Sequence, residues 1–135
     1  MANMTVAAPV VKSAAGGKRL KSVTFTHTAA GTADGSVASS PITGTLLRVL
    51  TNDGGDASWD LSFTASGAVI WEQTALGTGA QTYPLGICWD GTTPDGATDA
   101  CMWGIPVFGE AITCTTANMS GSGTGPVITI IYREE

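Results

Sequence analysis

The run of residues 127–132, Val-Ile-Thr-Ile-Ile-Tyr, constrains the fold of this chain more than any other stretch. Its β-branched and aromatic residues favour a strand over a helix. A second β-rich run lies at residues 105–116, and the Gly- and Ser-rich segment 120–126 separates the two. This order predicts a β-hairpin with a long, flexible tip. A strand as apolar as residues 127–132 must be buried on at least one face, so the rest of the chain must supply a covering layer.

Short strands also account for the rest of the chain. Apolar and polar residues alternate most cleanly at residues 57–64, where Trp59, Leu61 and Phe63 would share one face of a sheet. The run 42–51 has no polar face, which predicts burial on both sides, and the small polar residues 29–41 predict a long loop. Residues 46–73 predict an antiparallel meander. In total we expect about eight strands, at residues 20–28, 42–51, 57–64, 68–73, 82–90, 101–107, 111–116 and 127–133.

The architecture that these strands favour is all-β. The chain has 135 residues, enough for one domain with its own core, and no convincing helical pattern. We expect an antiparallel, jelly-roll-like sandwich at residues 20–135, with an immunoglobulin-like sandwich as the alternative. Residues 1–19 are rich in Ala and Val, contain Pro9 and include the pair Gly16-Gly17, which predicts an extended N-terminal arm with a flexible joint.

Charge is divided unevenly along the chain. The formal net charge is −5, yet four of the six basic residues precede the first acid at position 34: Lys12, Lys18, Arg19 and Lys21. From residue 22 onward two arginines stand against eleven acids, a formal charge of −9. An acidic body repels phosphates, which argues against nucleic acid as the main ligand. Either the arm is a solvated terminus, or it docks on an acidic neighbour, including another copy of the chain.

The spacing of the cysteines and the hydropathy of the chain bear on the state of the thiols and on association with a membrane. The three cysteines, Cys88, Cys101 and Cys114, lack the Cys-x-x-Cys spacing of zinc sites. At most one intramolecular disulfide could form among them, and buried free thiols are expected instead. We expect no secretory leader and no membrane span, because Gly, Thr and Asp interrupt each apolar run. Charged residues make up only 13% of the chain, which suggests that other protein covers part of the surface.

No catalytic, cofactor or metal site is expected. His27, the single histidine, is in phase with Val23 and Phe25, which favours a packed core histidine. A Ser-His-Asp triad that used Asp60 or Asp90 would lack a nucleophile-elbow pattern. Residues 121–125 are rich in glycine but precede a strand, so they lack the helix N-terminus that binds phosphate.

The loop acids and the tryptophans also favour structural roles. Asp90, Asp95 and Asp99 do not have the spacing of an EF-hand, so these residues are interpreted as turn formers, and so are Asp53 and Asp56. The four tryptophans lie in strand-like runs, which favours packing in a core or an interface over stacking on sugar rings: Trp59, Trp71, Trp89 and Trp103.

The whole pattern resembles small structural proteins of tailed bacteriophages, above all the capsid decoration (cement) proteins. The likeness consists of the N-terminal arm, a low-charge sandwich rich in Gly, Thr and Ala, and the closing runs 109–116 and 127–135 around a Gly/Ser tip. The resemblance implies a virion protein without enzymatic activity, made in the host cytoplasm and bound to the outside of the phage head. It also implies a homotrimer that bridges neighbouring major capsid proteins. It carries over no binding residue.

The division of charge suggests where the capsid contacts lie. We expect the arm to add strand pairing or groove contacts to a neighbouring protein. The arm residues expected to make these contacts are Val6, Val10, Val11, Lys12, Lys18, Arg19 and Lys21. Deleting the residues before Lys18 is then expected to abolish attachment and leave the fold intact. Two alternatives stay open: another external virion part (tail, neck or head fibre) that binds host-surface glycans, and a jelly-roll enzyme or metal-binding module.

Overall fold

The computed structural model of the chain describes residues 4–13, 19–27, 34–52, 58–76, 79–88, 101–119 and 125–134. For residues 12–13, 19, 86–88 and 101–103 the description covers the backbone alone. Within these ranges every regular element is a β-strand, and every strand pairing is antiparallel. The prediction of an all-β antiparallel fold is therefore confirmed.

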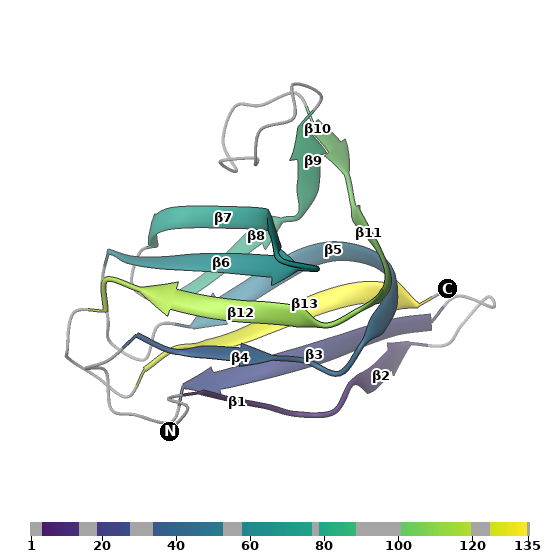
Figure 1. Cartoon of the computed structure of the whole chain (residues 1–135). Coiled ribbons are helices and arrows are strands. Elements are labelled where there is room, and N and C mark those ends of the chain that lie inside the picture. Colours follow the sequence, from purple (N-terminus) through teal and green to yellow (C-terminus); the bar gives the residue numbers. More distant parts are fainter. Residues whose placement is uncertain are drawn as a thin grey trace.

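The larger of two stacked sheets is built around the C-terminal strand (Figure 1). This strand, β13, lies between β3 and β5. The far edge of β3 is shared by β1 and β2, and the far edge of β5 by β8 and β11. The seven strands of this large sheet are β1 (Met4–Val6), β2 (Val10–Ser13), β3 (Arg19–His27), β5 (Ile42–Asn52), β8 (Ala80–Pro84), β11 (Ile105–Glu110) and β13 (Val127–Glu134).

The smaller sheet packs against the large one in the order β4-β12-β6-β7. Its strands are β4 (Ser36–Ala38), β12 (Ile112–Ala117), β6 (Trp59–Ala65) and β7 (Ala68–Leu76). A separate two-stranded ribbon, β9 (Gly86–Cys88) with β10 (Cys101–Trp103), rises away from both sheets (Figure 1).

The pairing of the strands is nested, which is the connectivity of a jelly roll. The first sandwich strand, β3, pairs with the last, β13, and β4 pairs with β12. Inside these pairs, β5 pairs with β8 and β11, and β6 pairs with β7. β8 and β11 pair with different parts of the same edge of β5 and count as one strand position. Each sheet of the sandwich then has four positions, which makes eight in total. The arm strands β1 and β2 and the β9–β10 ribbon are additions to this frame.

The predicted C-terminal hairpin is wrong, although both of its strands exist. β12 pairs with β4 and β6 in the small sheet, whereas β13 pairs with β3 and β5 in the large sheet. The connection between them therefore crosses from one sheet to the other. Local composition identifies a strand through its β-propensity, but it carries little information on which strand becomes its partner. For the same reason the meander at residues 46–73 fails: β5 and β6 lie in different sheets, and only β6–β7 is a hairpin.

A β-bulge explains why residues 42–51 have no polar face in the sequence. Ile131 pairs with Arg48 and Tyr132 with Leu46, so Leu47 is an extra residue in β5. The buried positions consequently shift from even to odd numbers along the strand, and only one face of β5 is buried. The prediction of burial on both sides is thus wrong. The loop predicted at residues 29–41 also contains a strand, the three-residue β4.

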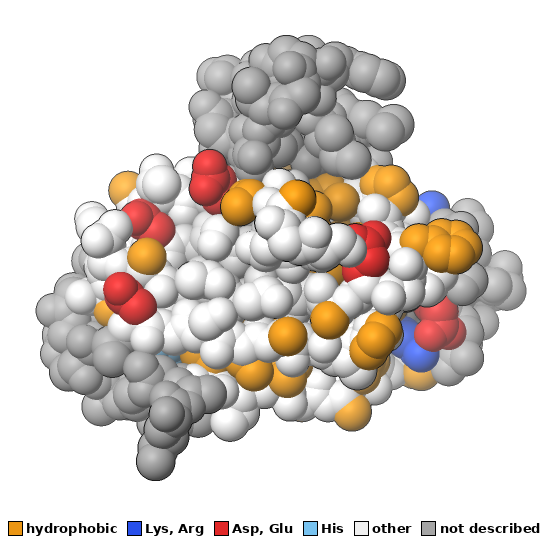
Figure 2. All heavy atoms as spheres, viewed as in Figure 1, with side chains coloured by type: hydrophobic (Ala, Val, Ile, Leu, Met, Phe, Trp, Pro, Cys, Tyr) orange, Lys and Arg blue, Asp and Glu red, His pale blue; other side chains and the backbone are white. Residues whose placement is uncertain are grey.

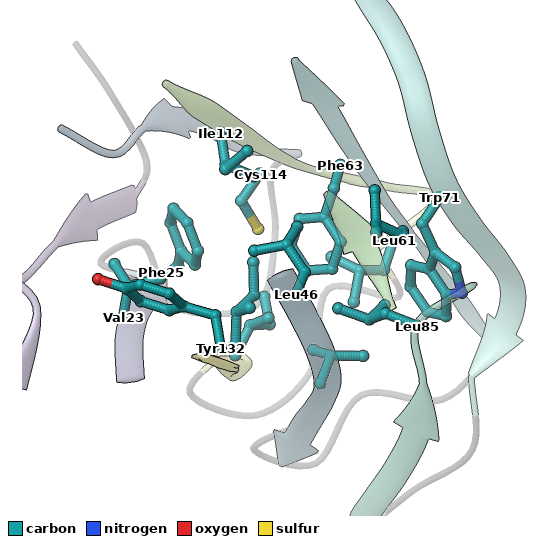
Figure 3. Close-up of a cluster of buried hydrophobic side chains, with 14 of the residues drawn as sticks. Val23, Phe25, Leu46, Leu61, Phe63, Trp71, Leu85, Ile112, Cys114 and Tyr132 are labelled. Carbon is teal, nitrogen blue, oxygen red and sulfur yellow. The ribbon is translucent and has the colours of Figure 1, made fainter. Parts of the chain in front are cut away.

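Aromatic side chains from both sheets fill the core (Figure 3). Phe63 of β6 stacks on Trp71 of β7 with 5.6 Å between ring centroids, and its ring lies 6.3 Å from that of Phe25 of β3. Tyr83 of β8 closes the cluster at 5.9 Å from Trp71. Truncation of a buried aromatic residue to alanine costs about 3–5 kcal/mol, so this cluster is the main link between the sheets.

The N-terminal arm lies along its own sheet. β1 and β2 both pair with β3, and Met4 is only 1% exposed. Val6, two residues along and therefore on the same face, packs partly buried against the core. The arm covers backbone groups that β3 would otherwise present at the edge of the sheet. The expectation that its deletion leaves the fold intact is not supported, because the deletion removes Met4 from the core.

Candidate interaction face

The solvent side of the large sheet forms one broad surface. Residues directly opposite each other in antiparallel strands share a face, so the registers of the large sheet place its outward side chains in rows. One such row runs Val10, Ser22, Ile131, Arg48, Pro84, and its neighbours bury Ser22 so that the other four residues form the surface. We call this surface the outer face. Its outward residues are Val10, Leu20, Thr24, Thr26, Thr43, Thr45, Arg48, Leu50, Thr82, Pro84, Pro106, Phe108, Val127, Thr129, Ile131 and Arg133.

The outer face is aliphatic and threonine-rich, and its only charged members are Arg48 and Arg133. Val127 is 41% exposed and Arg48 is also exposed, whereas Ile131 and Thr129 between them are half-buried. Thr24 and Thr129 join their hydroxyls at 3.1 Å across β3 and β13. No acidic residue of the described ranges belongs to these rows. Such a surface is apolar enough to dock on protein and polar enough to stay hydrated when it is uncovered.

The described lysines and arginines lie on the large sheet, whereas described acids occur on both sheets. Five of the six lysines and arginines lie on strands of the large sheet, and the sixth, Lys18, lies outside the described residues. Asp60 and Glu72 lie on the small sheet, whereas Glu110 of β11 and Glu134 of β13 lie on the large sheet. Glu110 accepts a 2.8 Å hydrogen bond from Ser66 in the turn between β6 and β7. Figure 2 shows the small-sheet side, where acidic side chains are scattered over a largely uncharged surface.

The predicted arm residues are partly brought together on the large sheet. Val10 and Val11 of β2 are 54% and 44% exposed, but Val6 packs against the core. Lys12 and Arg19 lie on β2 and β3, with only their backbones described. Lys21 forms an ion pair with Glu134 of β13, so its charge is already compensated within the chain. Of the predicted set, Val10 is the residue that joins the outer face.

Sequence reasoning missed Arg48, Arg133 and Phe108. The two arginines are far from the arm in the chain, and only the pairing of β13 with both β3 and β5 brings them into its sheet. Phe108, at the β11 edge, is 87% exposed. The sequence shows only that an aromatic residue, Phe108, lies in a β-rich run. Alternation alone does not say which face of that strand is covered, so it could not predict that Phe108 is exposed.

Local hydrogen bonds fix the backbone that carries Phe108. The Phe108 N–H donates to Glu110 Oε1 at 3.1 Å, and the Gly109 N–H donates to Thr43 Oγ1 at 2.8 Å. The register shift between Phe108 and Glu110 marks a bulge, and Gly109 adopts φ 65°, which favours glycine. Beside the ring is a shallow hollow of about 100 Å³, lined in part by Thr43, Thr45 and Pro106. A backbone held in place before binding loses little entropy when a partner covers the side chain that it carries.

The described residues considered for catalysis, His27 and Asp60, lie on different sheets. His27 is buried, as its phase in β3 predicts. Asp60 accepts hydrogen bonds from the Ala75 N–H at 2.9 Å and from Asn118 Nδ2 at 2.5 Å, on the outward side of the small sheet. Within the described ranges, no three His, Cys, Asp or Glu residues lie close enough to hold a metal ion. The following predicted loop residues lie outside the described ranges: Asp53, Asp56, Asp90, Asp95, Asp99 and residues 121–124.

Two of the four tryptophans are unavailable to sugars. Trp59 and Trp71 are 0% exposed, so neither ring can stack on a ligand. Trp89 and the side chain of Trp103 lie outside the described part of the chain. A shallow hollow of about 190 Å³ on the small sheet is lined by polar and small residues such as Asp60, Glu72 and Gln73, without an aromatic ring.

Comparison of the chain with models of known protein families and with curated proteins finds no match. The described residues include no helix long and apolar enough to cross a membrane. The likeness to capsid decoration proteins therefore rests on the sequence pattern alone.

Proposed function

We propose that this protein is a capsid cement that attaches to the outside of a phage head through the outer face of its large sheet. The observation that carries the proposal is the charge of the outer face itself. The outer face has two arginines and no described acid, while Asp60 and Glu72 lie on the small sheet and the Glu110 and Glu134 positions of the large sheet are not in the outward rows. When a chain with a net charge of −5 meets an acidic shell, a face with arginines is favoured for contact over a face with acids.

The size of the outer face supports attachment in many copies. Five strand positions about 4.8 Å apart and eight residues of about 3.3 Å each give a flat area of roughly 600 Å². A stable interface between two proteins usually buries about 800 Å² on each partner. One face alone would thus bind weakly. A homotrimer that engages several major capsid proteins at once would gain the missing affinity through multivalency.

The residues of the outer face suit a surface that is hydrated before the subunit attaches and is covered by a partner afterwards. Threonine hydroxyls make hydrogen bonds with water or with a partner, and the aliphatic residues among them gain free energy when covered. Phe108 and Arg48 are of the residue types that dominate interface energies. We infer that the partner surface on the major capsid protein is flat and carries carboxylates opposite Arg48.

Charge reversal at Arg48 tests this docking face. The variant Arg48→Glu should bind heads assembled without the protein at least about tenfold more weakly, because it places an acid against the inferred carboxylates. The matched control is Glu72→Arg, an equal and opposite change at an exposed position on the small sheet. Co-sedimentation of each variant with purified heads measures the binding. If Glu72→Arg loses attachment and Arg48→Glu keeps it, the small sheet is the docking face.

Copy number tests the function itself. A cement is present in hundreds of copies in a purified particle, whereas a tail, neck or fibre protein is present in a few or a dozen. Quantitative mass spectrometry of purified particles gives this number directly. A low copy number would overturn the cement proposal and favour the alternative of another external part that binds host-surface glycans.

A further inference from the structure

The β9–β10 ribbon places two of the three cysteines opposite each other. Cys88, the last residue of β9, pairs with Cys101, the first residue of β10. The pair lies at the tip of the ribbon, and the pair of Gly86 and Trp103 lies at its base. The base is fixed to the large sheet, because the Gly104 N–H donates to the Leu85 carbonyl at 2.8 Å and the Leu85 N–H donates to the Leu47 carbonyl at 3.0 Å. The opposed positions of the two cysteines are thus set by the backbone of an anchored ribbon.

This backbone geometry meets the requirement for a disulfide. Residues directly opposite in an antiparallel pair have Cα atoms about 4.5 or 5.5 Å apart, depending on their place in the hydrogen-bond ladder. Disulfides join cysteines whose Cα atoms are about 4.4–6.8 Å apart. Both kinds of opposed pair fall in this range. By the spacing of its Cα atoms, the ribbon is therefore suited to a bridge between Cys88 and Cys101.

The third cysteine is excluded as a competitor. Cys114 lies on β12 in the small sheet, is 0% exposed and is a free thiol. Burial raises the pKa of the Cys114 thiol well above its ordinary value, so the reactive thiolate is scarce. Three cysteines allow three different disulfides in principle. The fold excludes the two that would involve Cys114, which leaves Cys88 with Cys101.

We propose that Cys88 and Cys101 form a disulfide across the β9–β10 ribbon when the protein meets a disulfide oxidant, while Cys114 stays a thiol. One thiolate attacks oxidised glutathione and releases one glutathione thiol, which leaves a mixed disulfide. The second thiolate attacks that protein sulfur and releases the second glutathione. The protein loses two electrons and two protons, and the oxidant becomes two thiols. This inference is independent of the proposed cement function.

The cross-link would stabilise a weak element. Each strand of the ribbon has only three residues, and an isolated two-stranded ribbon is marginally stable in water. A bond between Cys88 and Cys101 closes residues 89–100 into a loop and limits the conformations that the opened ribbon can adopt. The ribbon would hold a dithiol in a reducing cytoplasm and a disulfide in oxidising surroundings.

Mass spectrometry of the full chain tests the pairing. After equilibration with oxidised glutathione, the mass should fall by about 2 Da, the two hydrogens lost, and denatured protein should bind one thiol reagent instead of three. Asp90, Asp95 and Asp99 lie between the two cysteines, so an aspartate-specific protease separates them into peptides that only the disulfide joins. Reduction should release these peptides.

Two variants are the controls. Cys114→Ser should form the same linked peptides and leave no reactive thiol, whereas Cys88→Ser should gain the mass of glutathione on Cys101 instead of losing hydrogen. The inference is overturned if the wild-type protein carries separate glutathione adducts on both ribbon cysteines. It is also overturned if all three thiols stay reactive under these conditions, or if the linked peptide contains Cys114.

Discussion

At the scale of single residues, backbone irregularities decide what each face displays. Without the extra residue Leu47, the alternation that buries Gly44 and Leu46 would turn Arg48 into the core. The bulge places Arg48 outward, in the row of Ile131, where a charge costs little. Gly44 is the second residue of β5 that its place in the sheet requires, because a Cβ there would lie 2.1 Å from the Arg133 carbonyl oxygen. These two residues let β5 approach β13 closely and still present a charge on the outer face.

Alanine at Gly44 should destabilise the protein strongly. The added methyl group would meet backbone of β13, which cannot move without separating the two central strands, and Gly44 has φ +153°. We expect a loss of at least about 2 kcal/mol, or about 6 °C or more in the melting temperature. The control is Gly67→Ala in the β6–β7 turn, where φ is +81° but nothing lies within 4 Å of the new atom. That change should cost only the strain of the left-handed conformation, about 1 kcal/mol. Equal melting temperatures for the two variants would contradict the close approach of β5 and β13.

At the scale of elements, short strands depend on side-chain hydrogen bonds at their ends. β4 has only three residues, yet both of its ends are tied to β12. Before the strand, the buried Gly35 N–H donates to Thr116 Oγ1 at 2.9 Å. After it, Ser39 Oγ accepts from the Ile112 N–H at 3.0 Å. These bonds explain why a segment that the sequence presents as loop forms the edge of the small sheet.

Thr116→Val should therefore loosen β4. Valine has nearly the same shape but leaves the buried Gly35 N–H without its acceptor, which costs about 1–3 kcal/mol. Hydrogen exchange at the amides of residues 35–38 should accelerate more than exchange in β13. Thr115→Val is the control, because Thr115 Oγ1 meets Ser36 Oγ at an exposed site, where loss of the bond costs less than about 0.5 kcal/mol. Unchanged exchange at β4 in Thr116→Val would show that the backbone pairing holds the strand by itself.

At the scale of the whole molecule, the sandwich is two-sided. Its large sheet carries the basic strands and the arm, and its small sheet carries Asp60 and Glu72. Lys21 and Glu134 form an ion pair within the large sheet, and Arg48 is an exposed charge on the outer face. A contact that depends on few charges should respond measurably to ionic strength.

Attachment to heads should weaken as salt rises. Screening shortens the Debye length from about 10 Å at 0.1 M to about 3 Å at 1 M, which reduces the attraction between arginines and carboxylates. Binding isotherms over this range should show a clear loss of affinity for the wild-type protein and a smaller loss for Arg48→Glu. Attachment that strengthens with salt would instead indicate a contact dominated by burial of Phe108 and the aliphatic residues.

The sequence by itself determined the all-β class, seven of the eight strand positions of the sandwich, and the burial of His27, Trp59 and Trp71. These features follow from alternation and β-propensity, which are local. Only the tertiary structure decided that β12 and β13 belong to different sheets, that the arm lies on β3, and that Arg48, Arg133 and Val10 share one face. Each of these depends on partner choice between strands far apart in the chain. Partner choice is set by the packing of two sheets and by single-residue bulges, which no window of neighbouring residues contains.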